Sequence, residues 1–381
     1  MLQDHELGAW LRLCLTPGVG NATARQLLAA FGLPEAIFDQ SHAALAKVVS
    51  PQRASALKVE PEGWRDLFDT TRRWLTEPTS GGQRTERDIL TLGDPDYPAE
   101  LLQTEDPPLM LYLLGQRSAL RVPHRVAMVG SRNPTPQGAD NAYQFAHALA
   151  QAGVCVVSGL ALGVDGAAHE GALDGGGSTL AVVGTGLDRV YPKKHLTLAH
   201  RIAAQGALLS EYPLGTPPLG PNFPKRNRII AGLSHGTLVV EAALQSGSLI
   251  TARLASEQGR EVFAIPGSIH APQARGCHAL IRQGAKLVES AQDVLEDLRL
   301  SLPKASPTSM PHRSTCDDDA PCSVAEHPLL TVLGYDPVNL DTLQARTGLD
   351  TPTLQAQLLE LELDGHIASL PGGQFQRLGR G

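Results

Sequence analysis

Three glycine-rich turns in the middle of the chain carry polar residues of the kinds that hold a phosphate. The first is Gly130-Ser131-Arg132, the second begins at Ser158-Gly159, and the third, at residues 184–187, precedes Lys193. Glycine lets a ligand approach the backbone, arginine offers a fork of donors, and a following helix adds free N–H groups. One such turn also suits an ordinary strand-to-helix connection. Three of them, with Arg132 and Lys193 close by, favour a phosphate-bearing ligand.

None of these turns has the spacing of a Walker A loop or of a GxGxxG dinucleotide site. The pattern therefore argues against an ATPase and against a dehydrogenase, and no cofactor is predicted.

The densest positive charge in this region lies beside an aromatic residue. The segment NFPKRNR places Lys225, Arg226, Asn227 and Arg228 directly after Phe223. Basic side chains can follow a phosphate backbone while an aromatic ring stacks on a base, which is what unpaired nucleic-acid strands require. The alternative is that Arg226 and Arg228 form ion pairs that fix a helix to a sheet, and Arg228 could do so even if Arg226 does not.

Short apolar runs, each followed by a glycine-rich turn and a helical pattern, must position these loops. Continuous apolar runs that alternate with helices indicate a parallel sheet covered on both faces, and ligands of such sheets bind at the carboxyl ends of the strands. We therefore expect a Rossmann-like, doubly wound α/β domain over residues 81–300. The predicted strands are residues 126–129, 154–157, 179–183, 238–240, 262–265 and 286–288.

Residues 1–80 are expected to form a small helical domain that resembles a SAM or helix-hairpin-helix unit. Apolar residues at helical spacing lie on both sides of the turn TPGVG at residues 16–20. Such a turn can present backbone N–H groups to a DNA phosphate. An ordinary corner between two packed helices explains the same residues equally well, so both interpretations stay open.

A flexible linker is predicted at residues 301–327, because proline, serine and an acidic triplet occur there without periodicity. A winged helix is expected at residues 328–381, with helices at residues 329–333, 340–346 and 354–363 and a hairpin at residues 365–375. The third helix of such modules often binds DNA. Here its sequence, TLQAQLLELELDGH, has three acidic residues and no lysine or arginine, which favours a protein contact or a structural role.

The amino-acid composition excludes several further classes of protein. The 381 residues carry a formal net charge of −7, so any nucleic-acid site must be local rather than spread over the surface. The five cysteines form no CxxC pair, which argues against a disulfide framework and a zinc site, and no metal is predicted. Neither a signal peptide nor an apolar run long enough to cross a membrane occurs, so we expect a cytoplasmic protein without membrane insertion.

Several strings resemble the bacterial DNA-processing protein A (DprA/Smf) family over about residues 95–298. They are GSRNPT, SGLALGVDGAAHEGAL, TGLDRVYP, LLSEYPLG, FPKRNRIIAGLS, VVEAALQSGSLITARLASEQGREVFAIPGS and GCHALIRQGAKLV, in this order. The helical N-terminal segment and the winged-helix tail are similar to those of longer family members. The resemblance implies a homodimeric recombination mediator that binds and protects incoming single-stranded DNA and loads the RecA recombinase onto it during natural transformation, rather than an enzyme.

The same resemblance implies roles for single residues. It places Arg132 on a DNA phosphate, Lys193 at the DNA backbone, and Arg226 with its neighbours in the binding groove. His278 and Leu287 lie in the segment that such proteins use for self-association, with recombinase contacts expected nearby. The tail helix is acidic, which departs from the family pattern and argues against a DNA-binding role for this helix.

The main alternative is a nucleotide-processing enzyme of the phosphoribohydrolase-like Rossmann group, with Glu241 and Asp165 as acid–base residues. The chain has Ala231-Gly232-Leu233 where that group has its PGG-and-GT loop. We therefore predict that Glu241 is a buried hydrogen-bonding residue that caps a loop, and that Asp165 and His169 orient the helix that begins there. A third reading makes the chain an adaptor in which only the terminal domains are active.

Overall fold

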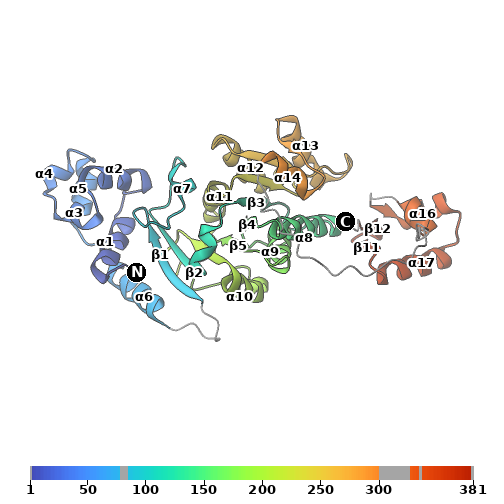
Figure 1. The fold of residues 1–381 in the computed structure, drawn as a ribbon, viewed down its shortest axis with the longest axis horizontal. Coiled ribbons are helices and arrows are strands. Elements are labelled where there is room, and N and C mark those ends of the chain that lie inside the picture. Colours follow the sequence, from blue (N-terminus) through green and yellow to red (C-terminus); the bar gives the residue numbers. More distant parts are fainter. Residues whose placement is uncertain (1, 78–84, 300–326, 334–336, 379–381) are drawn as a thin grey trace, which may run out of the picture.

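The computed structural model describes residues 2–77, 85–299, 327–333 and 337–378, and it begins with helices (Figure 1). Proline at the first turn starts two of them, and the hydroxyl groups of Ser41 and Ser50 accept hydrogen bonds from backbone N–H groups at the starts of two. Both are ordinary helix-start signals. The helices are α1 (Asp4–Leu15), α2 (Asn21–Phe31), α3 (Pro34–Asp39), α4 (His42–Leu45), α5 (Pro51–Leu57) and α6 (Trp64–Thr76).

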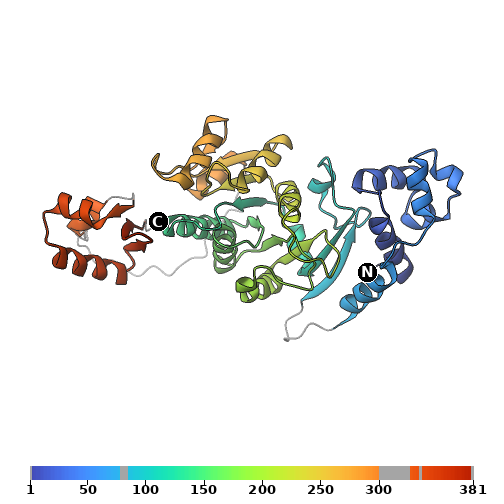
Figure 2. The same cartoon turned by 180° about the vertical axis from the view of Figure 1, so that it is seen from behind.

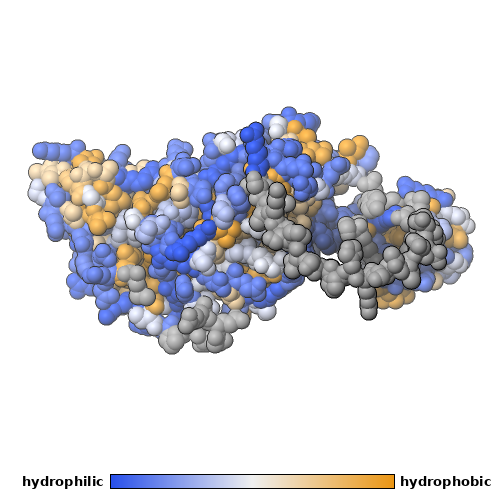
Figure 3. Space-filling model, viewed as in Figure 1, coloured by the Kyte–Doolittle hydropathy of each residue, from blue (hydrophilic) through white to orange (hydrophobic). Residues whose placement is uncertain are grey.

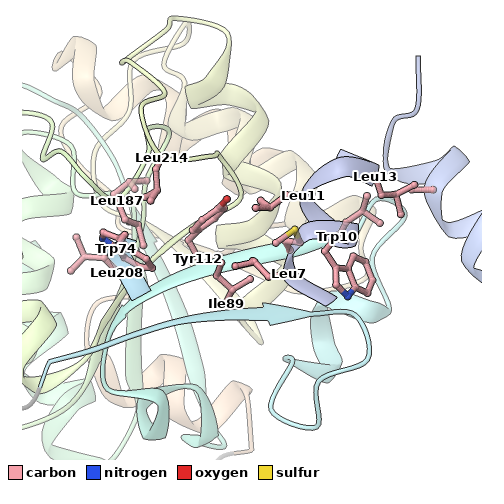
Figure 4. Close-up of a cluster of buried hydrophobic side chains, with 14 of the residues drawn as sticks. Leu7, Trp10, Leu11, Leu13, Trp74, Ile89, Tyr112, Leu187, Leu208 and Leu214 are labelled. Atoms are coloured by element: carbon pink, nitrogen blue, oxygen red, sulfur yellow. The ribbon is translucent and has the colours of Figure 1, made fainter. Parts of the chain in front are cut away.

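The helical segment packs against one face of the sheet that follows. Leu7 and Trp10 of α1 belong to the same buried cluster as Ile89 and Tyr112 of the sheet, as Figure 4 shows. The rings of Trp74 and Tyr112 meet edge to face, with centroids 6.1 Å apart. The N-terminal helices and the sheet therefore share one apolar core. The expected boundary at residues 80 and 81 lies outside the described residues.

A nine-stranded sheet forms the centre of the chain, in the order β1-β2-β6-β5-β4-β3-β7-β8-β9. Strands β3 to β9 pair in parallel, whereas β2 pairs antiparallel with both β1 and β6. The strands are β1 (Glu86–Thr91), β2 (Met110–Gly115), β3 (Arg125–Val129), β4 (Cys155–Ser158), β5 (Thr179–Val182), β6 (Ala207–Ser210), β7 (Gly236–Val239), β8 (Glu261–Ala264) and β9 (Lys286–Leu287).

The doubly wound parallel sheet is confirmed, and so are the six predicted strands, which correspond to β3, β4, β5, β7, β8 and β9. Strands β1, β2 and β6 were not predicted. β1 begins with the charged residues Glu86 and Arg87 at the sheet's edge, so it lacks the continuous apolar run that marks a central strand. β2 and β6 are as apolar and buried as the predicted strands, and sequence reasoning missed them.

Helices cover both faces of the sheet (Figures 1 and 2). In β3, Ala127 and Val129 point into one buried cluster with α11 and α12, whereas Val126 and Met128 point into another with α8, α9 and α14. The helices of this region are α7 (Ala99–Leu102), α8 (Pro136–Gln151), α9 (Val164–Asp174), α10 (Leu196–Gln205), α11 (Asn222–Leu233), α12 (Ser248–Glu257), α13 (Arg275–Arg282) and α14 (Ala291–Asp297), with short 3-10 turns at Arg117–Arg121, Lys193–His195 and Pro272–Ala274.

The order of the strands reverses at β3. The chain builds β4, β5 and β6 on one side of β3 and then returns to place β7 on the other side. The connections that leave β3 and β7 consequently diverge at their carboxyl ends. In open α/β sheets this switch point is where ligands bind.

The last part of the chain is a winged helix, as predicted. Its own apolar core contains Leu343, Leu354, Leu358 and Leu361. Its elements are α15 (Pro328–Leu333), β10 (Val338–Asn339), α16 (Leu340–Thr347), α17 (Thr351–Leu363), β11 (Ile367–Leu370) and β12 (Gln374–Arg377). The expected linker at residues 301–327 lies, except for its last residue, outside the described part of the chain.

Within the described ranges, no helix is both long enough and apolar enough to cross a membrane. Apolar side chains do reach the surface in places, and Figure 3 shows several of them on the N-terminal helices.

Candidate nucleic-acid interface

A pocket of about 360 Å³ lies at the switch point of the sheet. Of the predicted site residues, the structure brings Gly130, Arg132, Phe223, Arg226 and Asn227 together in its lining. The loop after β3 supplies the first two and α11 supplies the others. The remaining lining residues are Val129, Ala161, Asp165, Pro224, Ser246, Gly247, Ser248, Ile250 and Thr251.

The loop that carries Arg132 is held by a carboxylate from the neighbouring strand end. Glu241 accepts hydrogen bonds from the backbone N–H of Thr135 at 2.9 Å and from its hydroxyl at 2.5 Å. Thr135 is the N-cap of α8, and its hydroxyl oxygen accepts from the N–H of Gly138 at 3.0 Å. A side chain on Gly138 would overlap the Glu241 carboxylate. The predicted role of Glu241 as a capping residue is thereby confirmed.

Arg226 is buried although it carries a charge. Its Nη2 donates to the carbonyl oxygen of Gly159 at 2.8 Å, and the carboxylate of Asp165 balances its charge. Asp165 in turn accepts from the N–H groups of Gly159 at 3.1 Å and Ala161 at 3.2 Å. Burial lowers the pKa of Arg226 and raises that of Asp165, and each is opposed by the charge of the other. Asp165, at the start of α9, therefore holds the second loop, whereas the sequence predicted that it orients the helix.

Aromatic rings gather at the mouth of this pocket. The guanidinium of Arg132 lies 5.7 Å from the centroid of the Phe223 ring, within the range of a cation–π contact. The ring of Tyr191 is 5.7 Å from Phe223 and is tilted by 39°. Tyr191 is 48% exposed, so one of its ring faces can meet a ligand. Rings next to cations are what a stacked base requires.

Two further predicted cations are exposed near these rings in the sequence. Lys193 begins a 3-10 turn two residues after Tyr191, and Lys225 lies two residues after Phe223 on α11. Among the residues that the structure describes, neither these lysines nor Arg132 forms an ion pair. The charges of Arg132 and Lys193 are therefore free to meet a phosphate, whereas that of Lys225 also acts on the carboxylate of Glu211.

The loop with Lys193 is tied to the second glycine-rich turn. Nδ1 of His195 lies 3.0 Å from the carbonyl oxygen of Leu160. Leu160 has a φ of 58°, a left-handed conformation that costs energy for a residue with a side chain. The absence of a side chain on Gly166 leaves room for the His195 ring. This contact fixes where Lys193 stands relative to the turn at residues 158–163.

Arg228 and Ser158 point elsewhere. Arg228 pairs with Glu211 and lies 3.4 Å from Asp106, so it fixes α11 to its neighbours as the alternative interpretation held. The buried hydroxyl of Ser158 donates to the carbonyl oxygen of Met128 at 2.6 Å. Ser131 uses its hydroxyl oxygen locally, accepting from the N–H of Asn133 at 3.1 Å. The side chains of these three residues are occupied within the protein.

His169 is an interior residue. Its Nδ1 lies 2.7 Å from the hydroxyl of Thr179, which donates to the carbonyl oxygen of Val156 at 2.7 Å. His169 must therefore donate through Nδ1. Burial, with the charges of His195 and Arg226, lowers its pKa to about 3.

The two residues expected at a dimer interface lie at the far edge of the sheet. Leu287 is in β9, the last strand, and is 45% exposed. Nε2 of His278, on α13, lies 2.9 Å from the carbonyl oxygen of Gly267. An edge strand with an exposed leucine can pair with a second copy of the chain.

The turn at residues 16–20 is not free for a phosphate. The side-chain amide of Asn21, at the start of α2, donates to the Asp106 carboxylate at 3.3 Å, and Arg25 donates to the carbonyl oxygen of Glu105 at 2.7 Å. Asp106 also pairs with Arg25 and Arg228, so the polar side chains at this helix end are used in contacts within the protein. The structure therefore favours the packed corner between two helices.

Sequence reasoning missed several residues of the pocket. Ser246, in the connection before α12, and Ser248 and Thr251, in α12 itself, add hydroxyl groups, and Tyr191 adds a ring beside Phe223. The string QSGSLITA was a usable signal, because it follows a buried strand and combines hydroxyl residues with glycine. Over the described residues, no group of three or more histidine, cysteine or acidic side chains could hold a metal ion.

Comparisons with known proteins place this geometry in a family. Residues 88–299 match the family described as DNA recombination-mediator protein A, and residues 313–373 match the DprA winged helix domain. Protein Smf of Escherichia coli is 43% identical over 317 residues, which cover 83% of this chain and 82% of that protein. The DNA processing protein DprA of Streptococcus pneumoniae is 50% identical over 204 residues, which cover 54% of this chain and 72% of that protein.

Two solved structures are similar as well. The X-ray structure of DprA from Streptococcus pneumoniae matches with a TM-score of 0.64 and 36% identity, covering 78% of this chain and 98% of that one. A structure of DNA processing protein A from Helicobacter pylori, described by its single-stranded DNA binding mode, matches with a TM-score of 0.51 and 33% identity, covering 56% of this chain and 96% of that one. This chain belongs to the DNA recombination-mediator protein A family, also called DprA or Smf.

Proposed function

We propose that this chain binds single-stranded DNA at the switch-point pocket and acts as a recombination mediator that protects the strand and loads RecA onto it. One observation carries the proposal: Arg132, Phe223 and Arg226 line a single pocket at the carboxyl ends of the parallel strands. The single-stranded DNA binding mode described for the Helicobacter pylori relative supports it. Cytoplasmic placement and a non-enzymatic role belong to the same proposal.

Each group in or beside the pocket has a distinct task. Arg132 lines the pocket and meets a phosphate, and Lys193 and Lys225, which lie outside its lining, meet phosphates farther along the strand, because all three are exposed and carry no ion pair among the described residues. The backbone of Gly130 approaches the strand closely. Phe223 and Tyr191 stack on a base, which favours unpaired DNA because a duplex hides the faces of its bases. Little sequence preference is expected, since every base has such a face.

Arg226 and its neighbours form the floor of the pocket. Its charge is opposed by that of the buried Asp165, so it contributes a weaker field than an exposed arginine would, but it holds the second loop in place. Asn227 donates from its side-chain amide to the carbonyl oxygen of Gly247 at 3.4 Å and thereby closes the wall toward α12. Ser158, Gly159 and Arg228 support this floor from within.

A homodimer through β9 and α13 would give two pockets to one strand. Each pocket holds only a few nucleotides, so linking two of them raises the effective concentration of the second site. His278 and Leu287 are the residues proposed for this contact.

The nucleotide-processing alternative has less support. Both carboxylate oxygens of Glu241 accept hydrogen bonds from Thr135, and Glu241 does not line the pocket. Asp165 does line it, yet it is occupied by two backbone N–H groups beside Arg226.

The experiment that tests the proposal is an equilibrium titration of single-stranded and duplex DNA of matched length with the purified protein. We expect clear preference for the single strand, and a lower affinity for it in an Arg132→Ala, Lys193→Ala variant, which has lost two phosphate contacts. Equal affinity for both forms of DNA would overturn the proposal. A nucleotide-hydrolysis assay tests the nucleotide-processing alternative. Growth of RecA filaments on DNA coated with a single-strand-binding protein tests RecA loading. If the chain is only an adaptor, the Arg132→Ala, Lys193→Ala variant should bind DNA as the wild type does.

A further inference from the structure

The third helix of the winged helix, α17, has two apolar stripes. The first stripe, Leu354, Leu358 and Leu361, is buried in the core of the module. The second stripe has helical spacing too, but it faces solvent. It consists of Pro352, Ala356, Leu359 and Leu363.

The leucines of the second stripe are among the most exposed large apolar side chains of the described residues. Leu359 is 58% exposed and Leu363 is 79% exposed. Positions i, i+4, i+7 and i+11 lie along one side of a helix, so these residues form a continuous seam rather than scattered surface leucines. A seam of this kind marks an interaction surface.

Charge identifies the kind of partner. Glu360 is exposed beside the seam, and Glu362 lies on its other side, where its Oε1 accepts from the N–H of Ser369 at 3.2 Å. Between Thr351 and Leu363 the helix has no lysine or arginine. An acidic helix repels the phosphates of duplex DNA, which a winged helix would otherwise meet at this element. A second copy of α17 would bring glutamates close to glutamates.

We propose that the exposed seam of α17, formed by Pro352, Ala356, Leu359 and Leu363, docks an amphipathic helix of a partner protein that carries leucines flanked by lysine or arginine. The helix of 13 residues offers the partner about 20 Å of seam, at roughly 1.5 Å per residue. Side chains of the two helices interdigitate along it, and the flanking cations face Glu360 and Glu362. The seam is separate from the DNA pocket, so the recombination-mediator protein could hold a strand and a partner together.

A labelled leucine–lysine peptide of the same length as α17, designed as an amphipathic helix, is the probe. Its binding to the full chain is measured by fluorescence anisotropy. A peptide of the same composition with its leucines spread around the helix is the control for charge alone. We expect the amphipathic peptide to bind at least about tenfold more tightly than the control peptide, because only it can bury its leucines along the seam.

The Leu359→Ser, Leu363→Ser double variant should weaken binding by at least about tenfold, because both leucines lose their apolar contact. The matched control is Leu33→Ser, Leu102→Ser, which removes two leucines that are 57% and 49% exposed elsewhere in the chain. It should leave the affinity unchanged. Circular dichroism verifies that both variants are folded.

Equal affinity of the seam variant and the wild-type chain would overturn the proposal, and so would equal binding of the two peptides. Sedimentation of the chain without peptide tests a second copy as the occupant. If the seam variant self-associates less than the wild-type chain, the seam binds a second copy of this chain and the proposal fails. Protection of the seam by duplex DNA in a cross-linking assay would overturn it as well.

Discussion

The guanidinium of Arg226 donates to the carbonyl oxygen of Gly159 across 2.8 Å, and the space that a side chain on Gly159 would need is filled by that guanidinium. The glycine of the second loop is thus required by a buried arginine on α11, and not only by the sharpness of the turn. The two elements that line the pocket are fitted to each other at this point.

Gly159→Ala should therefore displace Arg226. Its added methyl group overpacks the site, at a cost of about 1 to 3 kcal/mol in the free energy of unfolding, and we expect affinity for oligo-dT to fall because the pocket floor shifts. Urea unfolding and an anisotropy titration measure the two effects. Gly220→Ala is the matched control, since nothing lies within 4 Å of the added carbon. If both variants show the same free energy of unfolding and the same affinity for oligo-dT, the close contact between Gly159 and Arg226 matters neither for stability nor for DNA binding.

Arg132→Ala should lower affinity for oligo-dT and flatten its dependence on salt. Neutralising one phosphate contact on a single strand changes the slope of log affinity against log salt by about 0.7. Arg253→Ala is the control, because Arg253 is exposed and pairs with Glu257 on the outside of α12. An unchanged slope for Arg132→Ala would remove this residue from the DNA site.

Arg228→Ala should act on stability before it acts on DNA binding. Its side chain is 14% exposed, and its partner Glu211 is 7% exposed, so the change leaves a buried carboxylate without its cation. Loss of one partner from a buried pair costs about 3 to 5 kcal/mol. Urea unfolding should show this loss, while the salt slope of DNA binding by the folded variant stays at the wild-type value. A reduced slope would instead assign Arg228 to a phosphate.

His169 should make the protein less stable in mild acid. Its pKa is about 3 in the folded chain and about 6.5 in the unfolded chain, so only the unfolded chain takes up the proton between these values. The contribution of His169 is fully present above pH 6.5 and falls, as pH drops toward 3, by up to about 1.4 kcal/mol per pH unit.

His169→Asn removes this titration but keeps a donor for Thr179. The difference in unfolding free energy between the wild type and this variant should therefore shrink from pH 7 to pH 5, as measured by urea unfolding. Comparing the two proteins cancels the buried carboxyl groups Asp165, Glu211 and Glu241, whose raised pKa values act in the opposite direction. A difference that is constant with pH would contradict a neutral His169.

Leu287→Arg should break the proposed dimer, because it places a charge on the exposed leucine of the edge strand β9. Binding to long oligonucleotides should then weaken far more than binding to hexamers, which occupy one pocket only. Sedimentation measures the oligomeric state. Leu102→Arg, at a leucine that is 49% exposed on α7, is the control. Equal losses for long and short strands would count against two pockets on one strand.

Much of this protein could be predicted from its sequence because the signals are local. The apolar runs that became β3, β4, β5 and β7 are continuous and buried on both faces, so each carries its own pattern. The glycine-rich turns and the NFPKRNR segment were likewise visible as loops and as charge. Glu241 could be assigned a capping role because a carboxylate directly after a buried strand usually has a structural partner.

Only the tertiary structure decided which of these residues work together. Arg226 and Arg228 are two positions apart on α11, yet one lines the pocket while the other pairs with Glu211, because successive helical positions face different directions. Tyr191, in a loop, and Phe223, on α11, are 32 positions apart in the sequence and meet only in the folded chain. Strands β1, β2 and β6 form by pairing with neighbours, and that pairing is a property of the assembled sheet that no single segment encodes.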